Sequence, residues 1–269
     1  MNKTILITGS TDGIGFETAK SLIELGHNVL IHGRNKEKLV DTKAKLLKIN
    51  NKAQIHSYLA DLSAMNEVKE LASQILNDHS KLDVLINNAG VFVVANQVTQ
   101  DGLDIRYAVN TIAPYLLTQL LMPLLGQDSR VINLSSAAQA SIDPSELLTE
   151  SRLSDGEVYA KSKLGLTMWS FQLAHTLGDE GPVIVAVNPA SMIGSKMVNQ
   201  AYGVAGKSLK IGADVLVKAA LSDEFAEASG KYFDNDYGQF RLPHPDATDQ
   251  HKTKELTESI ESVLAKLGH

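Results

Sequence analysis

Short, continuously apolar runs alternate along this chain with longer segments of helical period. This alternation constrains the fold more than any other feature of the sequence. The segments "KTILIT", "NVLIHG", "QIHSYLA", "LDVLINNAG", "RVINLSS" and "GPVIVAVNP" have the length of strands. Strands that are apolar on both faces are typical of parallel sheets covered by helices on both sides. The sequence therefore predicts an α/β fold, with a doubly wound parallel sheet in a three-layer α/β/α arrangement.

The organisation of the chain favours a single domain. Its 269 residues suit one large α/β domain and would also fit two small ones, but no repeat, low-complexity segment or linker divides them. We therefore expect one domain over residues 1–269. Two long stretches interrupt the alternation, an insertion at about 137–158 and a loop at about 189–211. Long loops in compact domains tend to be functional, and we expect the second to close over a substrate.

The composition excludes several functional classes. The chain has no cysteine, which rules out disulfides, thiolate metal sites and cysteine nucleophiles. A net charge of -6 without long runs of like charge argues against nucleic acid or an anionic membrane as partner. No apolar run reaches membrane-spanning length, so we expect a cytoplasmic protein without a membrane partner. The eight histidines form no zinc-binding motif, and no metal is predicted.

A glycine-rich turn, "ITGSTDGIGFETA", separates the first strand from the first helix. Gly9, Gly13 and Gly15 have the spacing G-x-x-x-G-x-G. Glycines let the backbone approach a pyrophosphate, and the N–H groups at the helix start bind its oxygens. A tight turn without a ligand is the alternative, but the placement favours dinucleotide binding on a Rossmann-type fold. A P-loop is excluded because no Gly-Lys-Ser/Thr triplet ends the turn.

The end of the second strand bears on which dinucleotide is bound. Folds that bind NAD usually have an acidic residue here, which holds the ribose 2′-hydroxyl. This chain has Gly33 and Arg34 instead, and a guanidinium can bind a 2′-phosphate that an acid would repel. The sequence therefore favours NADP over NAD as cofactor. The alternative is an ordinary exposed arginine at a helix start.

The stretch "EVYAKSKLG" at 157–165 combines a tyrosine with two lysines. On a helix Lys163 lies about 40° around the axis from Tyr159, whereas Lys161 lies about 200° away. The ammonium of Lys163 can stabilise a phenolate and lower the tyrosine pKa from its usual value of about 10. We interpret Lys161 as a solvated lysine. A Tyr/Lys pair at this spacing also arises by chance, so its meaning depends on the other motifs.

Seven motifs occur together and in a fixed order: "TGSTDGIG", "ADLS" (60–63), "NNAG", "VNTIAPYLLT" (109–118), "NLSS" (133–136), "YAKSK" and "NPA" (188–190). With them the chain resembles the short-chain dehydrogenase/reductase family over nearly its whole length. The long gap between "NLSS" and "YAKSK" and the tail "SGKYFDNDYGQF" (229–240) resemble its retinol dehydrogenase-like branch. That branch often carries a membrane anchor, and we expect none in this chain.

The resemblance implies four catalytic residues. Tyr159 would be the general acid/base, and Ser136, rather than Ser135, would hydrogen-bond the substrate oxygen. Lys163 would bind the nicotinamide ribose and lower the pKa of Tyr159, and Asn110 would support a water-linked proton relay.

The resemblance also implies the cofactor contacts. The glycine turn would surround the pyrophosphate, Asp61 would contact the adenine, and Asn88 with Gly90 would line the cleft. A helix cap is the alternative for Asp61, and a purely structural role is the alternative for Asn88. The full set of expected contacts is Gly9, Ser10, Thr11, Gly13, Ile14, Gly15, Arg34, Asp61, Leu62, Asn88, Ala89, Gly90, Tyr159, Lys163, Pro189 and Ser195.

The chain departs from the family at two places. Asp12 stands where NADP-dependent relatives often have a basic residue, and its carboxylate would face the phosphates unless it caps the helix pointing away. After Pro189 the family usually has glycine, and this chain has Ala190, which suits the position if its φ is negative. A threonine usual five positions after the proline is replaced by Gly194, so Ser195 would take its contact with the nicotinamide carboxamide.

These features favour an NADP(H)-dependent oxidoreductase acting on a small-molecule alcohol or carbonyl substrate. The main alternative is a non-catalytic sensor that binds NADP(H), and a nucleotide-sugar epimerase ranks last because it needs a longer substrate domain. Apolar helices at 99–126 and 157–178 favour a two-fold homo-oligomer. We expect an apolar substrate pocket, although the same residues could simply pack the loops: Val91, Phe92, Val94, Ala138, Met192 and Tyr202.

Overall fold

The computed structural model describes residues 2–148 and 153–269, except for the side chains of Leu148 and Tyr202. Within these residues one sheet has the strand order β3-β2-β1-β4-β5-β6-β7-β8. Strands β1 to β6 occupy the predicted segments and, with β7, are parallel, whereas β8 pairs antiparallel with β7. The strands are β1 Thr4–Ile7, β2 Asn28–Gly33, β3 Ile55–Leu59, β4 Val84–Asn87, β5 Arg130–Leu134, β6 Val183–Asn188, β7 Lys231–Asp234 and β8 Gln239–Arg241.

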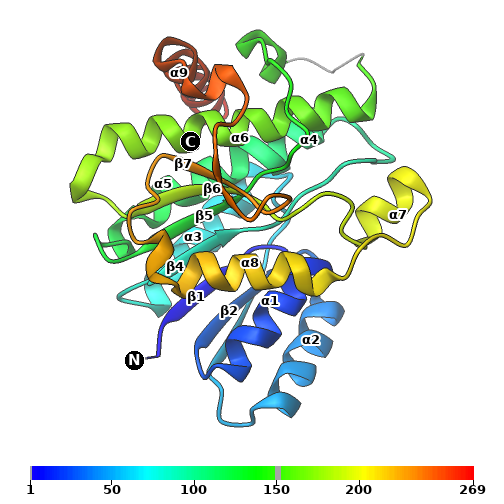
Figure 1. Cartoon of the computed structure of the whole chain (residues 1–269), viewed down its shortest axis with the longest axis vertical. Coiled ribbons are helices and arrows are strands. Elements are labelled where there is room, and N and C mark those ends of the chain that lie inside the picture. The colour runs from blue at the N-terminus through cyan, green and yellow to red at the C-terminus, as the bar shows by residue number, and fades with distance from the viewer. Residues whose placement is uncertain (1, 149–152) are drawn as a thin grey trace.

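Helices cover both faces of the sheet, which confirms the three-layer prediction. One buried core lies between the sheet and helices α1 and α8, and the other lies between the sheet and α3, α5 and α6. Figure 1 shows α1 and α8 on one side of the strands and α6 on the other. The helices are α1 Gly13–Glu24, α2 Lys36–Ile49, α3 Met65–Asp78, α4 Ile105–Tyr107, α5 Ala113–Leu121, α6 Asp155–Leu177, α7 Lys196–Tyr202, α8 Leu209–Leu221 and α9 Gln250–Lys266.

The long helix predicted over 99–126 is interrupted. It begins at Ile105, and a π-helical turn, Ala108–Ile112, separates α4 from α5. The N–H of Ala113 donates to the carbonyl of Ala108, five residues back. Pro114 explains the interruption, because it has no N–H to offer the carbonyl of Asn110. The helix then ends in a 3-10 turn, Met122–Leu124. The sequence analysis did not predict the π turn around Asn110.

Helix α9 covers the apolar surface that suggested an oligomer. Its residues Leu256 and Ile260 are fully buried in the same core as α5 and α6. The hydroxyl of Tyr115 donates to Glu261 over 2.6 Å, which fixes α9 across α5. Figure 1 shows α9 outside α6. This packing accounts for much of the apolar excess within one chain. Among the described residues, no helix has both the length and the apolar character needed to cross a membrane.

Candidate active site

A cleft of about 860 Å³ opens at the carboxyl ends of the parallel strands, where doubly wound sheets bind their ligands. Loops after each of β1 to β6 form it, together with α6 and α7. Most of the predicted site residues border it: Gly9, Thr11, Gly13, Ile14, Arg34, Asp61, Leu62, Asn88, Ala89, Gly90, Ser136, Tyr159, Lys163, Pro189 and Ser195. Ser10, Gly15 and Asn110 do not border it and lie behind its wall.

The glycine turn is held from behind by Asn88. The amide of Asn88 donates to the carbonyls of Thr8 and Gly9, at 2.8 and 3.1 Å. Gly9 and Gly13 have φ of 64° and 58°, the left-handed region that favours glycine. A Cβ at Gly15 would lie 2.5 Å from both the Asn88 amide and the Gly9 carbonyl, so only glycine fits there. Asn88 therefore has the structural role and also borders the cleft.

The front of the turn leaves room for a dinucleotide. A Cβ placed on Gly13 would have only Ser195 Cβ near it, at 4.0 Å. The N-terminus of α1 directs its N–H groups into this space, which suits a pyrophosphate. A Cβ at Gly90 would lie 3.4 Å from Lys163 Nζ, so the cleft narrows toward the lysine. The shape and donors of the cleft fit a nicotinamide dinucleotide lying from Gly13 toward Lys163.

His32, which the sequence analysis missed, ties the turn to strand β2. The N–H of Gly9 donates to His32 Nδ1 over 3.1 Å, and His32 Nε2 lies 3.0 Å from the carbonyl of Ala60. Burial lowers the pKa of His32 to about 4, so the ring is neutral with its proton on Nε2. Ser10 is held on the same strand, since its Oγ accepts from His32 N over 2.9 Å. Ser10 is fully buried and supports the turn from behind.

The adenosine end of the cleft contains Arg34 and Asp61. Arg34 is exposed at the cleft border. A Cβ at Gly33 would lie 2.6 Å from Thr11 Cγ2, so Gly33 makes room for the Thr11 side chain. Asp61 Oδ1 accepts from the N–H of Ser63 over 2.9 Å, which closes a turn before α3. The helix itself begins after Ala64, so Asp61 does not cap it.

Asp12 borders the cleft, and its carboxylate is paired. Its carboxylate caps α1 by accepting from Gly13 N over 2.9 Å and forms an ion pair with Lys196 of α7. Partial burial acts to raise the pKa of Asp12, but the bonds from Lys196 and Gly13 outweigh it and lower the pKa. Lys196 therefore offsets the negative charge that counted against NADP. The sequence gave no sign of this pair, because its members are far apart in the chain.

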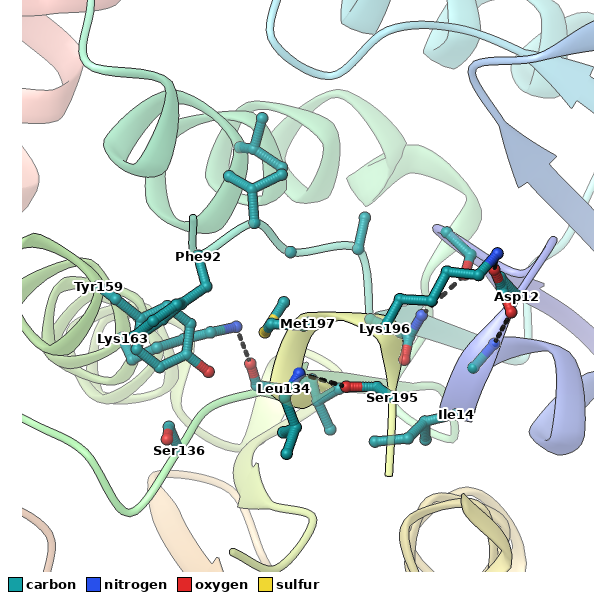
Figure 2. Close-up of a pocket in the computed structure, with 18 of the residues that line it drawn as sticks. Asp12, Ile14, Phe92, Leu134, Ser136, Tyr159, Lys163, Ser195, Lys196 and Met197 are labelled. Carbon is teal, nitrogen blue, oxygen red and sulfur yellow. Dashed lines mark hydrogen bonds and ion pairs between the residues drawn. The ribbon is translucent and has the colours of Figure 1, made fainter. Parts of the chain in front are cut away.

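Tyr159 and Lys163 share one face of α6, as their spacing predicted. The Nζ of Lys163 lies 5.9 Å from the centre of the Tyr159 ring and donates to the carbonyl of Leu134 over 2.7 Å. Burial lowers the pKa of Lys163 to about 8. Figure 2 shows both side chains in the cleft, with Ser136 near them. Ser135 also borders the cleft but is buried, with its Oγ 2.7 Å from Thr167 Oγ1, whereas Ser136 is half-buried.

Asn110 is buried behind the cleft and fixes two of its walls. Its amide group accepts from Val91 N over 2.8 Å and donates to Val91 O and Ser162 Oγ, each over 2.9 Å. The hydroxyl of Ser162 in turn donates to the carbonyl of Tyr159 over 2.7 Å. The side chain of Asn110 thus joins the loop after β4, which carries Gly90, to the helix carrying Tyr159. Its main-chain carbonyl receives no hydrogen bond from Pro114, four residues on, because proline has no N–H.

Most of the predicted apolar residues border the cleft. The rings of Phe92 and Tyr159 meet edge to face, with centres 4.6 Å apart. Val91, Val94, Ala138 and Met192 also border the cleft, and the side chain of Tyr202 lies outside the described residues.

Lys161, expected to be solvated, instead forms an ion pair. Its Nζ lies 2.8 Å from Glu146 Oε1, and the lysine side chain is only 17% exposed. The hydroxyl of Tyr107 donates to the other oxygen of Glu146 over 2.9 Å. Lys161 therefore fastens the insertion, which contains the 3-10 turn Pro144–Leu148, to the helix that carries Tyr159.

The loop at about 189–211, which we call the substrate loop, differs from the expectation at Ala190. Its φ is 107°, so the negative φ that alanine would need is absent and the residue is strained. A Cβ at Gly194 would lie 2.3 Å from the carbonyl of Ala205, so no threonine fits there. Ser195 lies one residue later, where its Oγ accepts from Val198 N over 3.3 Å and caps α7. Figure 2 shows Met197, also missed from the sequence, between Lys163 and Lys196.

Comparisons with known proteins agree with this geometry. A family model described as short chain dehydrogenase matches residues 3–202. Mouse retinol dehydrogenase 13 is 29% identical over 99% of this chain and 85% of its own length. Mouse retinol dehydrogenase 12 is 31% identical over 86% of this chain and 77% of its own length. A metagenomic short-chain oxidoreductase solved in complex with NADP is 27% identical, with a TM-score of 0.61 over 81% of this chain and 90% of its own. The chain belongs to the short-chain dehydrogenase family, in its retinol dehydrogenase-like branch, and is an oxidoreductase.

Proposed function

We propose that the chain is an NADP(H)-dependent alcohol dehydrogenase or carbonyl reductase with Tyr159 as general acid/base. The observation that supports it best is the meeting of Ser136, Tyr159 and Lys163 in the same cleft that the glycine turn borders. A sensor that only binds NADP(H) would need the glycine turn but not these three polar side chains. The intact set favours catalysis over the sensor.

In this proposal the bound nicotinamide supplies or accepts the hydride, and the protein handles the proton. In the direction of reduction, the hydroxyl of Tyr159 donates a proton to the substrate oxygen as negative charge develops there. Ser136 donates a hydrogen bond to the same oxygen and stabilises that charge. In the direction of oxidation, the phenolate of Tyr159 accepts the proton of the alcohol.

Lys163 and Asn110 support this proton transfer. A lysine with a pKa of about 8 keeps its charge at neutral pH, and a cation one helical turn from Tyr159 favours the phenolate. One of the three N–H donors of Lys163 binds the Leu134 carbonyl, and we assign the others to the nicotinamide ribose. The carbonyl of Asn110 then anchors the water that connects Lys163 to solvent.

The preference for NADP rests on charge at the adenosine end. Arg34 stands at the cleft border where an acid would select NAD. Lys196 pairs with Asp12, so the negative charge of the Asp12 carboxylate is compensated. The related metagenomic oxidoreductase was solved with NADP. We expect Arg34→Asp to reverse the preference between NADPH and NADH.

The substrate class follows from the apolar end of the cleft. Phe92 packs on the ring of Tyr159, Val91 and Val94 also border the cleft, and Met192 borders it from the loop after β6. Such a lining favours an apolar alcohol or carbonyl compound. The relatives named retinol dehydrogenases agree with this class.

A test compares NADPH oxidation with aldehydes and ketones of increasing chain length. Tyr159→Phe should lower turnover by at least about 100-fold, with NADPH binding retained in calorimetry. Tyr237→Phe is a matched control, because Tyr237 is 65% exposed and does not border the cleft. Unchanged turnover by Tyr159→Phe would refute its role. Tight NADPH binding by the wild type, without turnover of any carbonyl, would support the sensor.

A further inference from the structure

The substrate loop begins with two strained residues. Ala190 has φ 107° and Met192 has φ 60°, and no other non-glycine residue in the described part of the chain has a positive φ. Such conformations persist only where neighbouring contacts enforce them. Ser191 lies between Ala190 and Met192, so contacts of Ser191 can hold both residues at positive φ.

Asp236, in the turn between β7 and β8, binds Ser191 at three points. The N–H of Ser191 donates to both carboxylate oxygens of Asp236, at 2.8 and 3.0 Å, and its hydroxyl donates over 2.5 Å. Asp236 also accepts from the amide of Asn188, at the end of β6, over 3.0 Å. We call this set, Asp236 with Ser191 and Asn188, the Asp236 clamp.

The clamp is itself anchored to the sheet. Asn188 is 1% exposed, and its amide also donates to Asp234 Oδ1 over 2.9 Å. The same oxygen accepts from Asp236 N over 3.1 Å, which fixes the turn. Two cations balance the carboxylates, with Lys207 Nζ 3.6 Å from Asp236 and Arg241 3.7 Å from Asp234. The clamp therefore joins the loop to the rigid end of two strands.

The loop that leaves the clamp reaches the reaction centre. Lys207 N donates to the carbonyl of Met192 over 2.7 Å, which closes the base of the loop just beyond Ser191. Helix α7 carries Met197 to the same part of the cleft as Lys163. A Cβ built on Gly90 would lie 3.8 Å from Met197 Cε and 3.4 Å from Lys163 Nζ. A change of backbone at Ala190 would shift this side of the cleft relative to Lys163.

We propose that Asp236 is a positioning residue for the reaction: by holding Ser191 it keeps the strained turn at Ala190–Met192 and so sets α7 against the cofactor cleft. The inference rests on the proposed function for its kinetic readout. It also gives the tail segment 229–240 a role in the site, although this segment lies outside the cleft.

The test measures kinetics and hydrogen exchange in the full chain. Asp236→Ala should raise KM for the cofactor and for the carbonyl by about 10-fold, with kcat changed by less than about threefold, because the loop is displaced and Tyr159 is not. Hydrogen exchange over 189–202 should rise at least about 10-fold. Ser191→Ala, which keeps the N–H bonds, should give a smaller change in the same direction. Asp214→Ala removes an exposed carboxylate on α8 and should change neither quantity.

Rescue by glycine distinguishes positioning from general loss of structure. Glycine adopts φ 107° without strain, so Ala190→Gly added to Asp236→Ala should restore KM at least about threefold. An equal defect with and without Ala190→Gly overturns the inference, as does normal hydrogen exchange over 189–202 in Asp236→Ala. If the wild type has no turnover while exchange behaves as expected, the clamp stands and the proposed function fails.

Discussion

Gly9 and His32 are joined by a hydrogen bond in which the glycine N–H donates to the imidazole Nδ1 over 3.1 Å. The bond needs an unprotonated Nδ1, so the glycine turn depends on a neutral imidazole. The ring is held in that state by burial, which lowers the pKa of His32 to about 4.

This bond predicts acid sensitivity. Because the native pKa of His32 is below the value near 6.5 of an unfolded chain, its contribution to stability is complete above pH 6.5 and is lost as pH falls toward 4. The loss should reach about 3 kcal/mol of unfolding free energy. Denaturant unfolding of the wild type and His32→Asn across this range measures it. An identical pH slope in the two proteins would contradict the prediction. Comparing the wild type with His32→Asn isolates the effect of His32, because burial also lowers the pKa values of His27 and His79.

Lys163 predicts a second pH dependence, at the alkaline end. Its native pKa of about 8 is below its ordinary value of 10.5, so the unfolded chain binds more protons between these values. The unfolding free energy should therefore rise from pH 8 to pH 10 relative to Lys163→Met, by about 2 kcal/mol. Parallel stability curves for the two proteins would show that Lys163 is not desolvated.

Replacing Gly15 by alanine should change stability in the direction opposite to most glycine-to-alanine substitutions in helices. Glycine to alanine within an exposed helix normally stabilises by up to about 1 kcal/mol, but a Cβ at Gly15 meets Asn88 and Gly9 at 2.5 Å. Gly15→Ala should destabilise by about 1–3 kcal/mol and weaken NADPH binding. Gly156→Ala, on α6 with nothing within 4 Å, is the control and should be neutral or stabilising. Thermal melts measure the stability, and calorimetry measures NADPH binding. A Gly15→Ala variant with the stability and NADPH affinity of the wild type would refute the packing argument.

Much of the fold followed from apolar periodicity, because buried parallel strands are uniformly apolar and their helices amphipathic. The segments missed as strands, β7 and β8, are short, and β8 has exposed polar ends at Gln239 and Arg241, so neither carries that pattern. The π turn around Asn110 was missed because it depends on which hydrogen bonds Pro114 removes rather than on side-chain polarity.

In the candidate site as well, local features could be predicted from the sequence, whereas contacts between residues distant in the chain could not. Tyr159 and Lys163 are one helical turn apart, so their geometry was readable from spacing alone. His32 and Lys196 were missed because each depends on a partner distant in sequence, the Gly9 N–H and the Asp12 carboxylate. The strain at Ala190 was missed because φ is set by the Asp236 clamp and not by the local sequence.

Arg106 predicts a large loss of stability. Its side chain is fully buried, and it binds the equally buried Asp104 at 2.6 Å and Asp155 at the start of α6. Arg106→Met leaves a buried carboxylate without its cation and should cost about 3–5 kcal/mol. Arg106→Met with Asp104→Leu should recover part of this cost, because no unpaired charge then remains at Asp104. Chemical denaturation compares the variants, and a double variant no more stable than the single one would contradict the charge argument.

Ala190 predicts a stabilising substitution. Its φ of 107° is a conformation that glycine adopts without strain. Ala190→Gly should therefore raise the unfolding free energy by about 1 kcal/mol, or the melting temperature by about 2–4 °C. Ala226→Gly, at an exposed residue with φ -61°, should be neutral or destabilising. A lower melting temperature for Ala190→Gly would show that the position is not strained.

The two outer strands of the sheet, β3 and β8, have a consequence for how the protein behaves at high concentration. An unpaired strand edge can add a strand from another molecule unless it is short or polar. β8 has only three residues and exposes Gln239 and Arg241, and β3 exposes His56 and Ser57 in the middle of its five. Neither border offers a long apolar template, so the sheet resists growth into fibrils although its interior strands are largely apolar.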